Sequence, residues 1–378
     1  MNDFSRTDTS TLGRWWWTVD RLTLVSVAVL VGTGYVMMLA ASPAVAERIH
    51  VSRDMFILKQ VVFLLLASAV VVAVSILPPR GVRLLALAGC TLALALTLMT
   101  LVSGTEIKGA RRWVSLPGIS LQPSEFLKPC FAVVAAWLLS EGKREATKLR
   151  RLAWPAVACA IMASIALMLK AQPDMGMLAV LLGVLLVQLF VNGLNVILTA
   201  GLVGMMIAGG VAAYSFIGHF HDRVQRFWHP KNAADTYQLD HALQAFGSGG
   251  LLGRGAGEGR VKDLIPDAHA DFVYAVAGEE YGLIVCLCIL AVFGFIVLRA
   301  LLKQLHEREL FVVLAVTGLA TGFGLQAFVN MASTLGLIPT KGMTLPFISY
   351  GGSSALAVAL GIGMLLALTR RRNQGDPL

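Results

Sequence analysis

Apolar residues occur along this chain in blocks of about 20, separated by shorter polar stretches. A helix of that length crosses the hydrocarbon core of a bilayer. The pattern therefore predicts an all-α polytopic membrane protein with about ten transmembrane helices and a long external loop between the seventh and the eighth. The predicted spans are residues 22–41, 55–77, 84–103, 125–140, 153–170, 175–191, 195–217, 272–298, 310–332 and 353–369.

Composition agrees with a membrane protein. Only 14% of the 378 residues are charged and 57% are hydrophobic, whereas a soluble domain carries roughly a quarter charged residues. We find no internal repeat, so residues 21–370 are expected to form one membrane domain between the tails 1–20 and 371–378. The five cysteines lie in or beside apolar runs without a CxxC pair, which indicates core positions.

The positions of Lys and Arg orient the predicted spans. With the N-terminus in the cytoplasm, the internal loops and the C-terminal tail are rich in basic residues, as cytoplasmic segments of membrane proteins are. We therefore expect both termini in the cytoplasm, and the net charge of +9 does not indicate a nucleic-acid partner. The residues concerned are Arg80, Arg83, Lys143, Arg144, Lys148, Arg150, Arg151, Arg299, Lys303, Arg308 and Arg370–Arg372.

Two predicted external stretches, 104–124 and 218–271, are basic as well. They include Arg111 and Arg112 in the first and Lys262 in the second. Cations on the outer side oppose the usual distribution, so they need a local reason. Contact with acidic lipid headgroups is one reading, and a site for a phosphate-bearing ligand is the other, because guanidinium groups match phosphate oxygens.

The stretch QPSEFLKP, residues 122–129, predicts the start of a helix, with Ser124 able to cap it and Glu125 in the first turn. Glu125 and Lys128 are three residues apart and share a helix face. They form either a local ion pair at the membrane boundary or part of a site.

Two further motifs have simpler readings. QPDMG, residues 172–176 with Asp174, is explained by a tight turn between two spans. The glycine-rich stretch 241–260 lacks the strand and the Gly-Lys-Ser/Thr of a nucleotide loop. Its glycines are expected to let an external loop or a short re-entrant helix lie close against the bundle. Three nearby histidines lack the companion ligands of a zinc site.

Carboxylates gather at the predicted start of the eighth span. Asp271 begins that span, and Glu279 and Glu280 point in different directions two turns further on, so they are expected to serve different neighbours. Asp271 forms either a salt bridge with a loop arginine or a general base facing the external water. Between the last two spans, proline and glycine interrupt residues 330–354, and such backbone is tolerated only where it is buried or lines a cavity.

Taken together, these stretches resemble the SEDS family (shape, elongation, division, sporulation) of ten-span bacterial cell-wall glycan polymerases. The resemblance covers about residues 20–370. It rests on GARRW, QPSEFxK, QPDxG, the glycine-rich segment Tyr237–Gly255, the segment Pro266–Phe272, and LPFISYGGSS at Leu345–Ser354.

The resemblance implies that Asp271 is the essential external aspartate and that Glu125 and Lys128 are the functional pair of QPSEFxK. We place Arg111, Arg112 and Lys262 among the candidates that bind the substrate's diphosphate. Asp174, Lys341, Ser349 and Gly351 lie in matching motifs and are further candidate substrate-binding residues. Ala270 stands where the family usually has threonine, so a hydroxyl beside the aspartate is missing.

The chemistry implied by the family is polymerisation of lipid II by an inverting glycosyltransferase. A base accepts the proton of the acceptor's sugar 4-hydroxyl, and cations, with room for a divalent ion such as Mg²⁺ or Mn²⁺, stabilise the departing diphosphate. No organic cofactor is implied. The implied partners are undecaprenyl-diphosphate-linked glycan, a class B penicillin-binding protein, other division proteins and membrane lipids.

Within the family, Pro339–Gly342 followed by Thr344–Leu345–Pro346 looks like the division branch more than the elongation branch. This implies a bacterial inner-membrane protein at the septum. Two readings of other classes stay open: a lipid II flippase, which would need charges along a path through the membrane, and a non-catalytic division scaffold.

Overall fold

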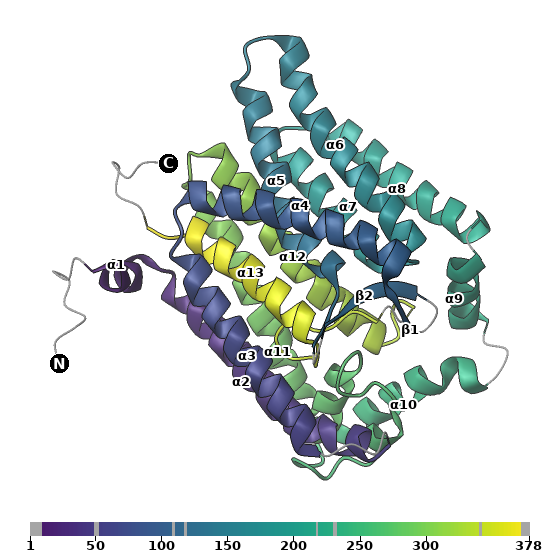
Figure 1. Cartoon of the computed structure of the whole chain (residues 1–378). Helices are drawn as coiled ribbons and strands as arrows, with labels where there is room; N and C mark the ends of the chain where they lie inside the picture. Colours follow the sequence, from purple (N-terminus) through teal and green to yellow (C-terminus); the bar gives the residue numbers. More distant parts are fainter. Residues whose placement is uncertain are drawn as a thin grey trace.

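The computed structural model describes residues 10–48, 53–107, 110–116, 119–216, 218–229, 233–339 and 342–371. These residues form a helical bundle with one small sheet (Figure 1). The helices are α1 (Thr11–Thr18), α2 (Arg21–Arg48), α3 (Arg53–Ser75), α4 (Pro79–Ser103), α5 (Pro123–Arg144), α6 (Lys148–Ala171), α7 (Met175–Val191), α8 (Val196–Phe216), α9 (Gly218–Trp228), α10 (Ala233–Gly249), α11 (Val273–Gln304), α12 (Leu310–Thr334) and α13 (Gly352–Leu368). The strands are β1 (Thr105–Ile107), β2 (Ala110–Leu116) and β3 (Ile119–Leu121), and Val261–Leu264 forms a 3₁₀ turn.

The expected all-α polytopic fold is confirmed, and each of the ten predicted spans is a helix. In the described part of the chain, α2, α3, α4, α6, α8, α11 and α12 are long and apolar enough to cross a membrane. Helices α7 and α13 are apolar but only 17 residues long, at the lower limit of about 17 residues for a span. Helix α5 has 22 residues and carries charges near both ends.

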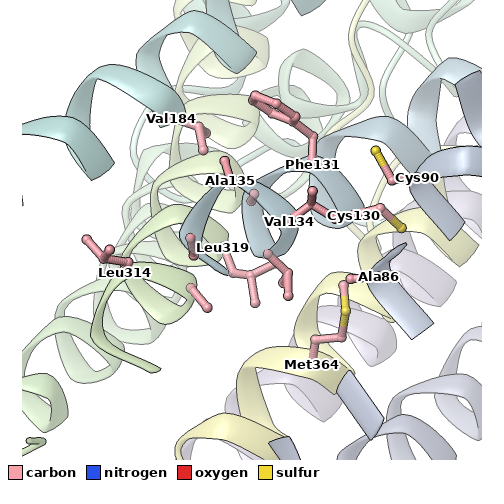
Figure 2. Packing of buried hydrophobic residues seen from close by; sticks show 14 of the residues in the cluster. Ala86, Cys90, Cys130, Phe131, Val134, Ala135, Val184, Leu314, Leu319 and Met364 are labelled. Carbon is pink, nitrogen blue, oxygen red and sulfur yellow. The ribbon is translucent and has the colours of Figure 1, made fainter. Parts of the chain in front are cut away.

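Helix α5 is the centre of the bundle. It contacts α4, α6, α7, α12 and α13, and nearly every residue of its middle is buried. A helix that is buried on all sides must be apolar all round, and small side chains let its neighbours approach closely. Figure 2 shows this packing, with Cys130, Phe131, Val134 and Ala135 of α5 between side chains of α4, α7, α12 and α13.

The predicted external stretches contain more regular structure than the sequence indicated. Strands β1, β2 and β3 form an antiparallel three-stranded sheet that contacts α4, α5 and α13, and the segment expected to be a long loop contains α9 and α10. Strands β1 and β3 have three residues each, too few to show an alternating pattern, and glycine within α10 hid its helical character. Helix α10 packs along α11, which confirms that the glycine-rich segment lies close against the bundle.

Helix α11 is interrupted at Gly282, whose φ of 78° and ψ of −178° are not helical. The interruption separates the carbonyls of Glu279 and Glu280 from the amides of Leu283 and Ile284, four residues further on, which a continuous helix would pair. The loop 250–255 satisfies all four groups. Arg254 N and Gly255 N donate to the two carbonyls at 2.9 and 3.0 Å, and Gly250 O and Leu251 O accept from the two amides at 3.0 and 3.3 Å.

This exchange requires glycine on both sides. A Cβ at Gly282 would lie 2.4 Å from Gly253 N and from Leu251 O, and a Cβ at Gly253 would lie 2.2 Å from Glu280 O. Both residues also have positive φ, which side chains other than glycine rarely adopt. The glycine-rich motif therefore completes the backbone hydrogen bonds of a broken membrane helix.

We expect Gly282→Ala to lower the thermal unfolding midpoint of the purified protein in detergent by several degrees, because the new methyl group meets backbone and the backbone is strained. The expected decrease in the free energy of unfolding is on the order of 1–3 kcal/mol. Gly294→Ala is the matched control: it lies in the same helix, and its Cβ would meet nothing within 4 Å. Equal midpoints for the two variants would contradict this account of the break.

Candidate active site

Asp271 lies in a turn just before α11, which begins at Val273 rather than at Asp271 as predicted. The carbonyl of Asp267 accepts the amides of Ala270 and Asp271 at 3.0 and 3.1 Å, which closes the turn. The Asp271 side chain is half-buried, while the next residues of α11 are buried. The turn therefore places a carboxylate at the surface of a rigid helix end.

Three successive backbone carbonyls hold this turn in place. His269 O accepts Tyr350 N at 2.9 Å, Ala270 O accepts the hydroxyl of Ser349 at 2.5 Å, and Asp271 O accepts Asn330 Nδ2 at 3.0 Å. The donors come from α12 and from the segment 342–351 that precedes α13. The backbone of Asp271 is thus fixed from two directions, which restricts where its carboxylate can point.

The segment 342–351 forms a wall beside the carboxylate. A Cβ on Gly342, whose φ is 63°, would lie 3.4 Å from Asp271 Oδ2. Ser349 is buried, and its hydroxyl also accepts Leu345 N at 2.8 Å. Gly351 packs its backbone against Thr344. Ser349 and Gly351 therefore shape the wall, and their contact with substrate stays a prediction.

Glu125 and Lys128 pair as predicted, and the lysine reaches further. Lys128 Nζ lies 2.7 Å from Glu125 Oε2 and 2.7 Å from Gln326 Oε1 of α12, and only 8% of its side chain is exposed. Ser124 does not cap α5: the N-cap residue is Gln122, which makes no side-chain cap, and Ser124 Oγ accepts Gln122 Nε2. The pair is therefore part of a larger network rather than a local ion pair alone.

Two amide side chains on α12 connect this network to Asp271. Gln326 Nε2 donates to Thr344 O at 3.1 Å, and Asn330 Nδ2 donates to both Met343 O at 2.6 Å and Asp271 O at 3.0 Å. Gln326 and Asn330 are one helical turn apart and so share a face of α12. The structure thus brings Glu125, Lys128, Asp271, Ser349 and Gly351 to one polar region.

Sequence reasoning missed Gln326 and Asn330. The available signal was a pair of amides at i and i+4 in an otherwise apolar span, since polar side chains at such depth need partners or a function. The partners themselves come from segments far away in sequence, so the pattern could not name them.

Arg112 and Asp174 form a second group. Arg112 donates to Gln172 O at 2.7 Å and Pro173 O at 2.9 Å, and its guanidinium lies 3.6 Å from Asp174 Oδ2. Asp174 in turn caps α7 by accepting Met177 N at 3.1 Å. These contacts attach β2 to the turn between α6 and α7, so the motif is more than the bare turn expected. The side chain of Arg111, the neighbouring strand residue, is exposed.

Lys262 is placed differently from the prediction. Its ammonium group pairs with Glu280 Oε1 and donates to Ala40 O at 2.8 Å, and the residue is only 5% exposed. Glu279 accepts the amides of Arg260, Val261 and Lys262, each at 2.8 Å. The two glutamates were expected to serve different neighbours, but both bind the segment 260–262, Glu279 through backbone amides and Glu280 through the Lys262 ammonium group. Lys262 holds the loop to α2 and α11 instead of facing a ligand.

Two predicted features have no described counterpart. Lys341 lies outside the described residues. Among the residues that the structure describes, no three His, Cys, Asp or Glu side chains gather closely enough to hold a metal ion. The described side chains therefore do not supply three such ligands to the divalent cation that the resemblance implies.

Comparison with known proteins covers nearly the whole chain. The model of the cell cycle protein family that groups FtsW, RodA and SpoVE matches residues 20–374. A probable peptidoglycan glycosyltransferase FtsW from Caulobacter vibrioides is 41% identical over 373 residues, covering 98% of this chain and 94% of the relative. The FtsW of Trichlorobacter lovleyi is 33% identical, with 93% of each chain covered.

Solved structures agree in fold. A chain from a peptidoglycan synthase complex that coordinates polymerisation and crosslinking has a TM-score of 0.78 at 27% identity, covering 94% of this chain and 98% of its own. The rod shape determining protein RodA of Thermus thermophilus has a TM-score of 0.68 at 27% identity, covering 94% of this chain and 97% of its own.

The Asn330 amide should control the order of the turn that carries Asp271. We expect Asn330→Leu to increase hydrogen–deuterium exchange in peptides covering 267–272 and 343–350, because the α12 side chain that donates to both segments is lost. Ser333→Ala is the control: its hydroxyl donates only to Asn330 O within the same helix. If both variants exchange like the parent, Asn330 does not hold the turn.

Proposed function

This chain belongs to the cell cycle protein family of FtsW, RodA and SpoVE, and we propose that it is a peptidoglycan glycosyltransferase polymerising lipid II into β-1,4 glycan strands. The relatives at 41% and 33% identity bear the name of that activity, and they match along almost their whole length. The observation that carries the proposal is the position of Asp271, a half-buried carboxylate on a turn held by Tyr350, Ser349 and Asn330.

Asp271 acts as the general base. The acceptor's 4-hydroxyl oxygen attacks the anomeric carbon of the donor sugar, and its proton passes to the Asp271 carboxylate as the new bond forms. The bond from that carbon to the phosphate oxygen breaks, its electron pair leaves with the diphosphate, and inversion converts an α linkage into a β linkage. A carboxylate cannot ionise an alcohol outright, but such assistance is worth about 10²–10⁴-fold, provided that the base is already in position.

The departing diphosphate needs positive charge. We assign this role to Lys128, which belongs to the polar network that reaches Asp271, and to Arg111 and Lys341 on the strength of their sequence motifs. Lys128 and Gln326 lie at the polar end of an otherwise apolar crevice between α5, α12 and α13. That arrangement suits a lipid-linked substrate, whose hydrocarbon stays in the bilayer while its diphosphate approaches the lysine.

The proposal extends to partners and location. One structural neighbour is part of a complex that coordinates polymerisation with crosslinking, which supports a class B penicillin-binding protein as the transpeptidase partner of this chain. The basic residues at the end of the bundle that carries α1 favour a cytoplasmic position for both termini. Asp271 then faces the outside of the inner membrane, where lipid II is polymerised.

Asp271→Asn should lower glycan synthesis by about 10²–10⁴-fold, because asparagine keeps the shape but cannot accept the proton. The assay is polymerisation of labelled lipid II by the purified protein with its transpeptidase. Asp240→Asn, the same change at an exposed position of α10, should retain full activity. Near-parental synthesis by the Asp271 variant, with the protein folded, would remove this residue from the chemistry.

The division role rests on the FtsW relatives and on Thr344–Leu345–Pro346, and it requires an expression and imaging test. We expect a fluorescent fusion to gather at midcell late in the cycle, and depletion to give smooth filaments, because septal synthesis stops while side-wall growth continues. An elongation enzyme would move in dispersed patches, and its loss would give rounded cells. That second pattern would reassign the role to elongation and leave the polymerase activity intact.

A further inference from the structure

A cleft opens at the end of the bundle opposite Asp271, where the connection between α1 and α2 meets the far end of α11. Its volume is about 620 Å³, within the range of about 300–1,000 Å³ that holds small ligands. The lining comes from three separate parts of the chain. It comprises Trp17, Thr18, Val19, Asp20, Arg21, Leu22, Arg299, Lys303 and Arg371.

The lining is strongly cationic. Four basic side chains face one carboxylate, that of Asp20, whose side chain is only 3% exposed. Arg299 donates to both Asp20 oxygens at 2.8 Å, and Lys303 Nζ lies 2.9 Å from Oδ2. Burial alone would raise the pKa of Asp20, but these hydrogen bonds outweigh it and lower the pKa to about 2. Asp20 is therefore ionised at neutral pH, and its charge neutralises only one of the four cations.

The two remaining cations stand at the mouth of the cleft. Arg21 and Arg371 are exposed, and the backbone amide of Arg371 donates to Thr18 O at 3.0 Å, which brings the segment after α13 against α1. A net positive charge concentrated in one cleft attracts an anion, and guanidinium groups match phosphate oxygens.

The rim of the cleft is apolar and aromatic. Trp15 anchors α1 by donating from Nε1 to Ser75 Oγ at 2.8 Å, while Trp16 and Trp17 are each 37% exposed. The Arg21 guanidinium lies 5.1 and 4.5 Å from the centroids of those two rings. Leu22, at the start of the spanning helix α2, is 54% exposed. Exposed tryptophans beside cations at the end of a span are typical of the membrane interface.

We propose that this cleft binds the headgroup phosphate of an anionic membrane phospholipid, with the acyl chains along the exposed apolar faces of α1 and α2. The apolar rim favours a phospholipid over a free phosphate, because a free phosphate has no hydrocarbon that could contact the apolar side chains. The site is separate from the substrate region, since Asp271 precedes the start of α11 and Arg299 lies near the other end of that helix. It therefore does not depend on the proposed function.

The test uses the full chain in neutral detergent, with the thermal unfolding midpoint followed as phosphatidylglycerol or phosphatidylcholine is added. Phosphatidylglycerol should raise the midpoint at much lower concentration than phosphatidylcholine. Arg21→Gln with Arg371→Gln should weaken this response by roughly 25-fold, at about fivefold for each arginine. Arg80→Gln with Arg150→Gln, two exposed cations at the same end of the bundle, should leave it unchanged.

Three results would overturn the proposal. An equal response to phosphatidylcholine would exclude recognition of charge, and an equal loss in the control pair would show a general surface effect. Inorganic phosphate acting as strongly as phosphatidylglycerol would assign the cleft to a soluble anion. Native mass spectrometry provides a second measurement that does not rely on the unfolding midpoint. It counts the phosphatidylglycerol molecules retained on the parent protein and on each variant.

Discussion

The structure depends on one constraint of the bilayer: backbone amides and carbonyls find no water in the hydrocarbon core, so the protein must pair them itself. Continuous helices do this alone, but α11 is broken at Gly282. The loop 250–255 replaces the two lost helical hydrogen bonds with four of its own. The loop is thereby bound to α11 through four backbone hydrogen bonds, which restrict its conformation.

This restriction extends to the candidate base. The loop continues through residues 260–262, whose amides bind the buried carboxylate of Glu279, and through Lys262, which pairs with Glu280. A buried ion pair contributes little net stability, but removing one partner is costly, so such a pair favours one arrangement over others. These contacts restrict the backbone that leads into the Asp271 turn. Donors from α12 and from the segment 342–351 then bind the carbonyls of residues 269–271. Positioning of the base is distributed over elements far apart in sequence.

The pairing of basic residues with carboxylates differs between the two ends of the bundle. At the end that carries Asp271, Lys128, Arg112 and Lys262 each have a protein partner within a network that includes a carboxylate, while the Arg111 side chain is exposed. At the end that carries α1, the buried carboxylate of Asp20 pairs with two cations, and two further cations line the same cleft. The first pattern suits a site whose charges must be oriented before a substrate arrives. The second leaves positive charge at a membrane surface rich in tryptophan.

The sequence alone determined the ten predicted spans. A run of about 20 apolar residues has the length that crosses a bilayer as a helix, and a helix pairs its own backbone groups there. It also singled out Asp271, Glu125 and Lys128, since charge beside an apolar span is costly unless it has a partner or a use. It could not show that Lys262 is buried against Glu280, because those residues meet only when the loop folds back onto α11. Nor could it find Gln326 and Asn330 as the link between the two motifs. Hydrophobic periodicity records which residues avoid water, but which polar groups meet is decided only by helix packing, and in this chain that packing makes the site.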